Sequence, residues 1–121
     1  MLKAFDSLVY FVEDVTQAAK WYASLLDCEV QYENKHYAFI VSGAVKIGFH
    51  PADSKSPSGY AGQTLYWSVD SLSGSIKWLE EKGALLYRGP IVSDLGEKVC
   101  MMLDPFGNSI GLTETVSVIE R

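Results

Sequence analysis

The chain has 121 residues, 48% of them hydrophobic, with a formal charge of −5 and a pI near 4.9. That length and apolar content are enough for one domain with its own core, without disulfides or a structural metal. Nucleic acid is disfavoured as a partner because the ten Lys and Arg are scattered among fifteen Asp and Glu. No apolar run reaches the roughly 18 residues that span a bilayer, and no signal-peptide pattern opens the chain. We therefore expect a cytoplasmic protein without membrane contact.

The N-terminal half reads as one strand, one helix and three further strands. Residues 5–12 alternate and are rich in β-branched and aromatic side chains, which predicts a strand. Residues 13–16 offer acidic and hydroxyl groups suited to a helix start, and an apolar stripe then predicts a helix to about Leu26. Polar turns separate three predicted strands, at residues 28–33, 37–41 and 45–50.

The C-terminal half repeats this order after a loop. Residues 51–63 hold two Pro, two Gly and three Ser, which predicts a linker. Asp70-Ser71 then starts a helix that runs to Lys82, with Gly83 as its stop. The predicted strands cover residues 64–69, 84–88, 98–103 and 109–114, with a turn at 104–108, a loop of unassigned course at 89–97 and a tail at 115–121.

The two halves also share sequence. The pair Lys20-Trp21 returns as Lys77-Trp78, a shift of 57 positions, and Ile47-Gly48-Phe49 returns as Ile110-Gly111-Leu112, a shift of 63. Two copies of one supersecondary unit usually pack around a pseudo-twofold axis and share a site there. We predict one α+β domain over residues 1–121, in which two tandem βαβββ modules, 1–50 and 64–114, form a curved mixed sheet around a central cleft.

The repeat, the helix openings and the ending Asp104-Pro105-Phe106-Gly107-Asn108-Ser109-Ile110-Gly111-Leu112 resemble the vicinal oxygen chelate superfamily. That superfamily includes glyoxalase I, bleomycin-resistance proteins, fosfomycin-resistance enzymes and extradiol dioxygenases. The resemblance implies their fold. It says little about the reaction, because one scaffold there hosts unrelated chemistries.

The resemblance also locates the positions where metal-using members hold an ion. Such members place a His on the first strand of each module and a carboxylate on the last. Those positions correspond here to Ser7 and Thr64, and to Gly48 and Gly111. Hydroxyls and glycines do not supply the imidazole, thiolate or carboxylate donors that a divalent ion needs, so we predict no metal cofactor. Each glycine also fits a bulge or a close backbone approach, and either explanation leaves room for a ligand.

Strand alternation places residues two apart on the same face, which predicts the groups that face the cleft. Leu8, Tyr10, Val12, Leu65, Trp67 and Val69 would face the helices. Tyr66 offers an aromatic face with a hydroxyl, and Arg88 could clamp a carboxylate, although such residues also serve as core or solvated groups. The predicted ligand-binding set is Ser7, Val9, Phe11, Gly48, His50, Thr64, Tyr66, Arg88, Gly111 and Thr113.

His50 is the candidate catalytic residue, because no other side chain in that set exchanges a proton near pH 7. A strand-end histidine bonded to the following loop is the alternative. We expect His36 to be solvated in a polar turn, and Trp21 and Trp78 to pack at contacts between elements or subunits. Cys28 and Cys100 have no setting that favours a disulfide or a reactive thiolate.

Three functions are compatible with these patterns. The first is a metal-independent protein that binds a small molecule in the cleft, as bleomycin-resistance proteins do. The second is a glyoxalase-like lyase or isomerase, or a dioxygenase-related enzyme, using His50 with a non-standard or absent metal. The third is a regulatory or interaction protein. We rank them in this order and expect a homodimer in each case.

Overall fold

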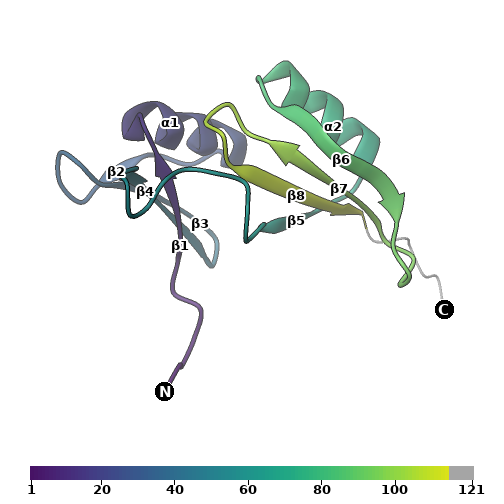
Figure 1. Cartoon of the computed structure of the whole chain (residues 1–121), viewed down its shortest axis with the longest axis horizontal. Helices are drawn as coiled ribbons and strands as arrows, with labels where there is room; N and C mark the ends of the chain where they lie inside the picture. The colour runs from purple at the N-terminus through teal and green to yellow at the C-terminus, as the bar shows by residue number, and fades with distance from the viewer. Residues whose placement is uncertain (115–121) are drawn as a thin grey trace. The chain divides into compact units, whose positions relative to one another are not determined.

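Two units of similar plan make up the computed structural model, which describes residues 1–114 (Figure 1). The first unit is Met1–Ser58 and the second begins at Gly59, so the boundary falls inside the predicted linker. Each unit contains one helix and one four-stranded mixed sheet, which confirms the predicted α+β class and the repeated module. The predicted tail at 115–121 lies outside the described residues.

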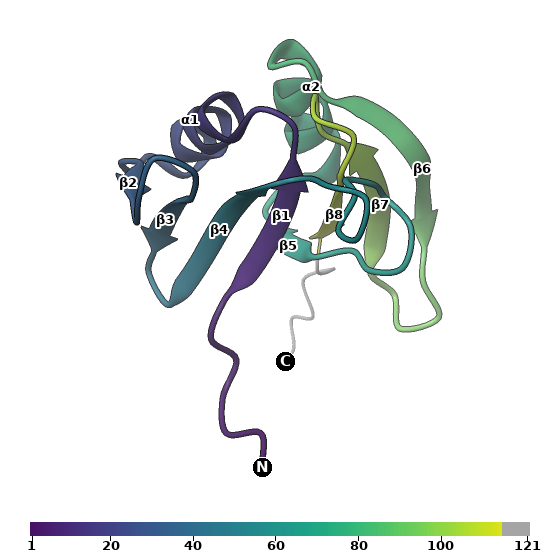
Figure 2. The same cartoon turned by 60° about the vertical axis from the view of Figure 1, so that its left-hand side comes forward.

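In the first unit, strand β1 (Leu8–Val12) is followed by helix α1 (Val15–Leu26), and α1 lies across one face of the sheet (Figure 2). The strand order is β1-β4-β3-β2, with β1 parallel to β4 and the other pairs antiparallel. The remaining strands are β2 (Gln31–Tyr32), β3 (Ala38–Ser42) and β4 (Val45–Pro51).

Local sequence explains how α1 begins and what it buries. The side chain of Asp14 caps the helix by accepting the N–H of Gln17 at 3.0 Å. Tyr22, which is 1% exposed, stacks on Tyr10 with ring centroids 5.0 Å apart and lies 5.5 Å from the Phe49 ring. This aromatic cluster is the centre of the first core, and it fixes the face of the sheet that α1 covers.

In the second unit, strand β5 (Tyr66–Val69) is followed by helix α2 (Leu72–Glu81). The strand order is β5-β8-β7-β6, again with the first and last strands of the module parallel. The other strands are β6 (Leu85–Val92), β7 (Lys98–Leu103) and β8 (Ser109–Glu114).

The predicted signals for α2 are confirmed. The Ser71 hydroxyl caps the helix by accepting a hydrogen bond from the backbone N–H of Gly74, with N and Oγ 3.1 Å apart. The Glu114 carboxylate accepts a hydrogen bond from the backbone N–H of Leu72, with N and Oε1 2.6 Å apart. Gly83 ends the helix with φ +102°, where the N–H of Ala84 bonds the carbonyl of Leu79 at 3.0 Å.

Several predicted boundaries are wrong. Strand β1 begins at Leu8 and β5 at Tyr66, so Ser7 and Thr64 precede their strands. The second predicted strand shrinks to Gln31–Tyr32, and β6 continues to Val92 through the first part of the expected loop at 89–97. This continuation is possible because β6 shifts register on both sides of Arg88, and because an edge strand tolerates Pro90.

Candidate functional site

Each sheet has one face under its helix and one open face, and the predicted alternation holds where burial can be compared. Tyr10 and Val12 are buried in the first unit, and Tyr10 contacts Tyr22 of α1. In the second unit Tyr66 and Ser68 are exposed, whereas Trp67 and Val69, which alternate with them, are half-buried. The residues of the predicted set that lie within β1 and β5, namely Val9, Phe11 and Tyr66, therefore alternate with the residues that face the helices.

A pocket of about 270 Å³ lies on the open face of the second sheet. Two of its lining residues, Tyr66 and Arg88, belong to the predicted set. The others were missed, although alternation along β7 would have identified Val99 and Met101. Ile91 could not be found because its segment was expected to be a loop. The full lining is Tyr66, Arg88, Gly89, Ile91, Val99, Cys100 and Met101.

Strand register explains how these residues meet. One row runs across all four strands, because Tyr66 pairs with Gly111, Gly111 with Met101, and Met101 with Arg88. The next row on the same face places Ile91 opposite Val99. The pocket thus collects residues from β5, β7 and β6, and its charged member comes from the edge strand.

Gly89 shapes the irregular wall of the pocket. It adopts φ +85°, and a Cβ there would lie 2.9 Å from the carbonyl oxygen of Val99 and 3.2 Å from Cα of Cys100. Only glycine fits both the backbone angle and this close approach to β7. The distortion lies between Arg88 and Ile91, the two β6 side chains that line the pocket.

The space expected above Gly111 is filled. A Cβ at this position would lie 2.6 Å from Cγ and Cδ2 of Tyr66, so the tyrosine ring rests directly on the glycine backbone. Of the two explanations for this glycine, the close approach applies. The volume available to a ligand is instead bordered by the Tyr66 side chain.

Gly48 in the first unit has a different environment. The ladder runs without a shift through its pairs with Val9 and Phe39, so no bulge explains this glycine. A Cβ would approach Val9 Cγ2 at 3.4 Å, which is an ordinary contact distance. The position has room for at least a methyl group above the sheet.

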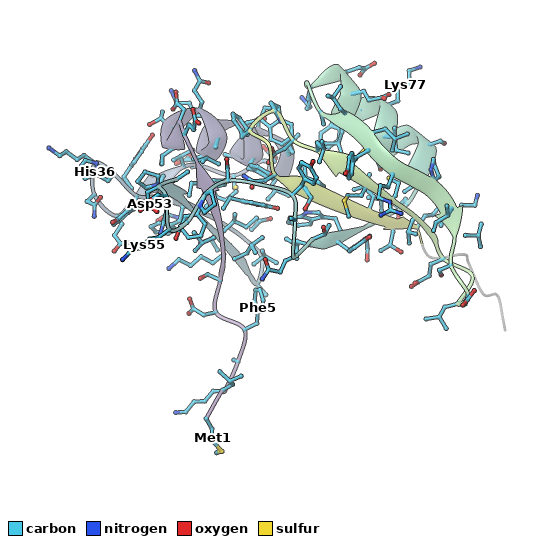
Figure 3. All side chains as sticks on the ribbon, in the orientation of Figure 1. Met1, Phe5, His36, Asp53, Lys55 and Lys77 are labelled. Atoms are coloured by element: carbon cyan, nitrogen blue, oxygen red, sulfur yellow. The ribbon has the colours of Figure 1, made fainter. Side chains whose placement is uncertain are left out.

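His50 lies among aromatic rings on the same open face. It pairs with Phe11 across the strands, with ring centroids 6.1 Å apart, and its ring lies 4.6 Å from that of Tyr37. These contacts hold the imidazole, but no proton acceptor or donor is defined by them, and its catalytic role stays a prediction. His36 lies exposed in the turn between β2 and β3 (Figure 3). Its backbone N–H donates a hydrogen bond to the side-chain oxygen of Asn34.

The predicted hydroxyl groups differ in what they bind. Ser7 is half-buried just before β1. The Thr64 hydroxyl shares a hydrogen bond of 3.0 Å with that of Ser109. Thr113 pairs with both Ser68 and Val99, and its buried Oγ1 has no hydrogen-bond partner among residues 1–114. Thr113 therefore lies next to the pocket without lining it.

The metal that the resemblance implies does not fit these residues. Two of the four expected donor positions are glycines, one of them covered by Tyr66, and the Thr64 hydroxyl is already bonded to Ser109. Across residues 1–114, no three His, Cys, Asp or Glu side chains gather in a way that could hold an ion. The side chains at the family's four usual positions are therefore unsuited to a divalent ion.

The two cysteines are free thiols, and neither is set up as a nucleophile. Burial raises the pKa of Cys100. The pKa of Cys28 is also raised, first by burial and then by the Asp27 carboxylate. Because the thiolate is the reactive form, both shifts lower reactivity at neutral pH.

No helix within residues 1–114 is long and apolar enough to cross a bilayer.

A second hollow, of about 420 Å³, lies at the end of β4 in the first unit. Its lining is Glu13, Ala52, Asp53, Pro57 and Ser58. Asp53 already accepts the N–H groups of Lys55 and Ser56 at 2.9 and 2.7 Å, within the same loop (Figure 3). The hollow contains no aromatic side chain, so it is less suited to an organic ligand than the pocket on the second sheet.

The family model for the Glyoxalase/Bleomycin resistance protein/Dioxygenase superfamily matches residues 4–112. A solved family enzyme from Burkholderia phytofirmans PsJN is similar, with a TM-score of 0.74, 16% identity, and coverage of 92% of this chain and 98% of that one. A superfamily member from Sphaerobacter thermophilus DSM 20745 has a TM-score of 0.74, 21% identity, and coverage of 94% and 98%.

An integron cassette protein from V. cholerae also has this fold, with a TM-score of 0.66, 22% identity, and coverage of 96% of this chain and 98% of that one. No curated protein matches the sequence. At these identities the solved structures show the fold, and the family model covers nearly the whole chain. The chain therefore belongs to the Glyoxalase/Bleomycin resistance protein/Dioxygenase superfamily.

Proposed function

We propose that this protein binds a small organic molecule without a metal, and that the pocket on the second sheet holds it. The observation that carries the proposal is the composition of that pocket. An aromatic ring, aliphatic side chains and one guanidinium surround about 270 Å³ of space. Ligand sites typically combine apolar walls with a few placed polar groups, and this pocket does so at a volume slightly below their usual range of roughly 300–1,000 Å³.

The chemistry of the lining supports binding over catalysis. The seven residues include no His, Asp or Glu that could act as a general acid or base. Cys100 is the only thiol among them, and burial raises its pKa. The Arg88 side chain offers hydrogen-bond donors and no acceptor. These groups can hold and orient a ligand, but they supply no proton transfer near neutral pH.

The proposal is tested by screening small organic molecules against the protein by calorimetry, in the presence and absence of a chelator. We expect stoichiometric binding that the chelator does not change, and no conversion of the ligand. Met101→Trp places a large side chain in the pocket and should abolish binding. Val92→Trp, at an exposed position at the end of β6, is the matched control and should bind normally. Turnover that depends on an added divalent ion would contradict the proposal.

We also propose that the binder acts as a cytoplasmic homodimer. Its two cysteines are free, as is usual in a reducing compartment. The edge strand β6 also exposes Leu85 (66%), Leu86 (39%) and Tyr87 (45%), which lie outside the pocket lining and are suited to a subunit contact. Light scattering should give twice the chain mass. A monomeric mass at working concentration, or recovery outside the cytoplasm on fractionation, would overturn the corresponding part.

A further inference from the structure

We infer that the pocket selects an anion, namely a flat apolar molecule that carries one carboxylate or similar acidic group. This inference rests on the proposed function, because it names the class of ligand for the same pocket. It is carried by three observations on the second unit: the charge of the lining, the position of the Tyr66 ring and the volume.

The charge of the lining has one sign. Arg88 is the only side chain of the seven that is ionised at pH 7, and no carboxylate lies in the lining. In the part of the chain that the structure describes, Arg88 forms no ion pair, and the nearby pair Lys98–Glu114 does not involve it. Its guanidinium presents donors that match a carboxylate in a two-bond geometry. A cationic ligand would find no counter-charge here.

The net charge of the protein does not itself attract an anionic ligand. At −5 the chain repels anions at long range. Preference for an anion must therefore come from direct contact with Arg88. Contact of this kind is screened by salt where the group is exposed, as Arg88 is.

Tyr66 provides a fixed aromatic surface. One face of its ring lies on the backbone of Gly111, with 2.6 Å between ring carbons and the position of a Cβ. The side chain is still 48% exposed, so the opposite part of the ring is open to a ligand. Val99, Ile91 and the flexible Met101 complete walls that suit a flat apolar body.

The volume limits the size of the ligand. A pocket of about 270 Å³ holds the liquid volume of about nine water molecules. One aromatic ring or two fused rings with an acidic group would fill it. A much larger molecule would leave most of its surface outside.

The experiment compares three probes that share a naphthalene body: 2-naphthoate, neutral 2-naphthamide and cationic 2-naphthylmethylammonium. Calorimetry on the full chain should show 2-naphthoate bound about tenfold or more tightly than the amide, as expected for a charge-assisted hydrogen bond. The ammonium probe should bind most weakly. Added salt should weaken binding of the carboxylate and leave that of the amide nearly unchanged.

Arg88→Gln should remove the preference, so that carboxylate and amide bind alike, and Arg88→Lys should restore part of it. Lys77→Gln is the matched control, since Lys77 lies exposed on α2 in the same unit and its loss changes the net charge equally (Figure 3). This variant should keep the full preference. Thermal melts check that each variant is folded.

The outcomes separate the two proposals. Equal affinity of the wild type for all three probes, unchanged in Arg88→Gln, would overturn the anion inference and leave the binding pocket in place. A preference for the ammonium probe would also overturn it. If none of the probes binds, the anion inference fails, and the screen with Met101→Trp decides separately whether the proposed binding function fails too.

Discussion

The open faces of the two sheets differ at equivalent positions. In the first unit Val9 pairs with Gly48, and in the second unit Tyr66 pairs with Gly111, in the same parallel arrangement of first and last strands. A Cβ on Gly48 would have an ordinary contact of 3.4 Å, whereas a Cβ on Gly111 would lie 2.6 Å from the Tyr66 ring. The same residue in the same register thus leaves space in one copy and supports an aromatic ring in the other.

The next row reverses this distribution of bulk. Phe11 and His50 pair in the first unit, with their rings 6.1 Å apart, whereas Ser68 and Thr113 pair in the second. Along the first sheet, the row with small side chains (Val9 and Gly48) comes before the row with large ones. Along the second sheet, the row that contains the large Tyr66 side chain comes before the row with small ones. The duplicated units keep their strand pairing and helix caps, and they differ on the face available to a ligand.

The cores also differ, and this difference predicts the largest effect. Tyr22 occupies the position equivalent to Leu79, and both are buried. Tyr22→Ala removes the ring that stacks on Tyr10 and packs against Phe49, and should lower the free energy of unfolding by about 3–5 kcal/mol. Leu79→Ala should cost about 2–4 kcal/mol. Urea denaturation measures both, and a larger loss for Leu79→Ala would mean that the aromatic core is not the main anchor of α1.

The turn that joins β7 and β8 comes next, compared with the loop that follows β4 in the first unit. The second unit uses residues 104–108, where buried Asp104 accepts the N–H groups of Phe106 and Asn108, both at 2.8 Å. Asp104→Ala leaves buried donors unpaired and should cost about 2–3 kcal/mol. The control is Asp53→Ala, which removes a similar pair of bonds from an exposed loop and should cost less than about 1 kcal/mol because water replaces them. Equal losses of stability in the two variants would show that burial does not determine what these hydrogen bonds contribute.

The glycine comparison can be tested directly. Gly111→Ala should destabilise the protein by about 1–3 kcal/mol, because the new methyl group displaces the Tyr66 ring. Gly48→Ala should change stability by less than about 1 kcal/mol. Combined with Tyr66→Ala, the Gly111→Ala change should cost much less than it does alone. Additive effects in this double-mutant cycle would refute the close approach of ring and backbone.

The helix ends predict the smallest effect. Helix α2 is followed by Gly83 at positive φ, whereas α1 is capped by Asp27, a non-glycine residue in the left-handed conformation with φ 52°. Asp27→Gly relieves this strain and should raise stability by about 0.5–1 kcal/mol. Gly83→Ala should lower it by a similar amount, since its φ is +102°. Thermal melts of the two variants should shift in opposite directions, and shifts in the same direction would contradict this account.

Much of the second sheet could be predicted, and the failure at β6 has a physical cause. Gly89-Pro90 reads as a break, since neither residue favours a strand interior. The strand continues because its register shifts let the backbone skip pairings there. Ile91 consequently lies opposite Val99, a pairing that depends on the partner strand and leaves no trace in the local sequence.

The candidate site divides in the same way. Tyr66 and Arg88 were predicted because alternation and residue chemistry are local properties, whereas the filled space above Gly111 depends on the strand next to it. The contribution of the remaining predicted residues to ligand binding stays a prediction.

The amino-acid sequence by itself determined the duplicated unit, the two capped helices, the alternation of most strands and the lack of metal-donor side chains at the family's usual positions. Each of these follows from residue identity and short spacing. Only the tertiary structure decided that Tyr66 covers Gly111, that Gly48 has room for a methyl group, and that Arg88 and Ile91 line one pocket together with residues of β7. Those features depend on register between strands far apart in the chain, where one shifted pairing changes which side chains meet.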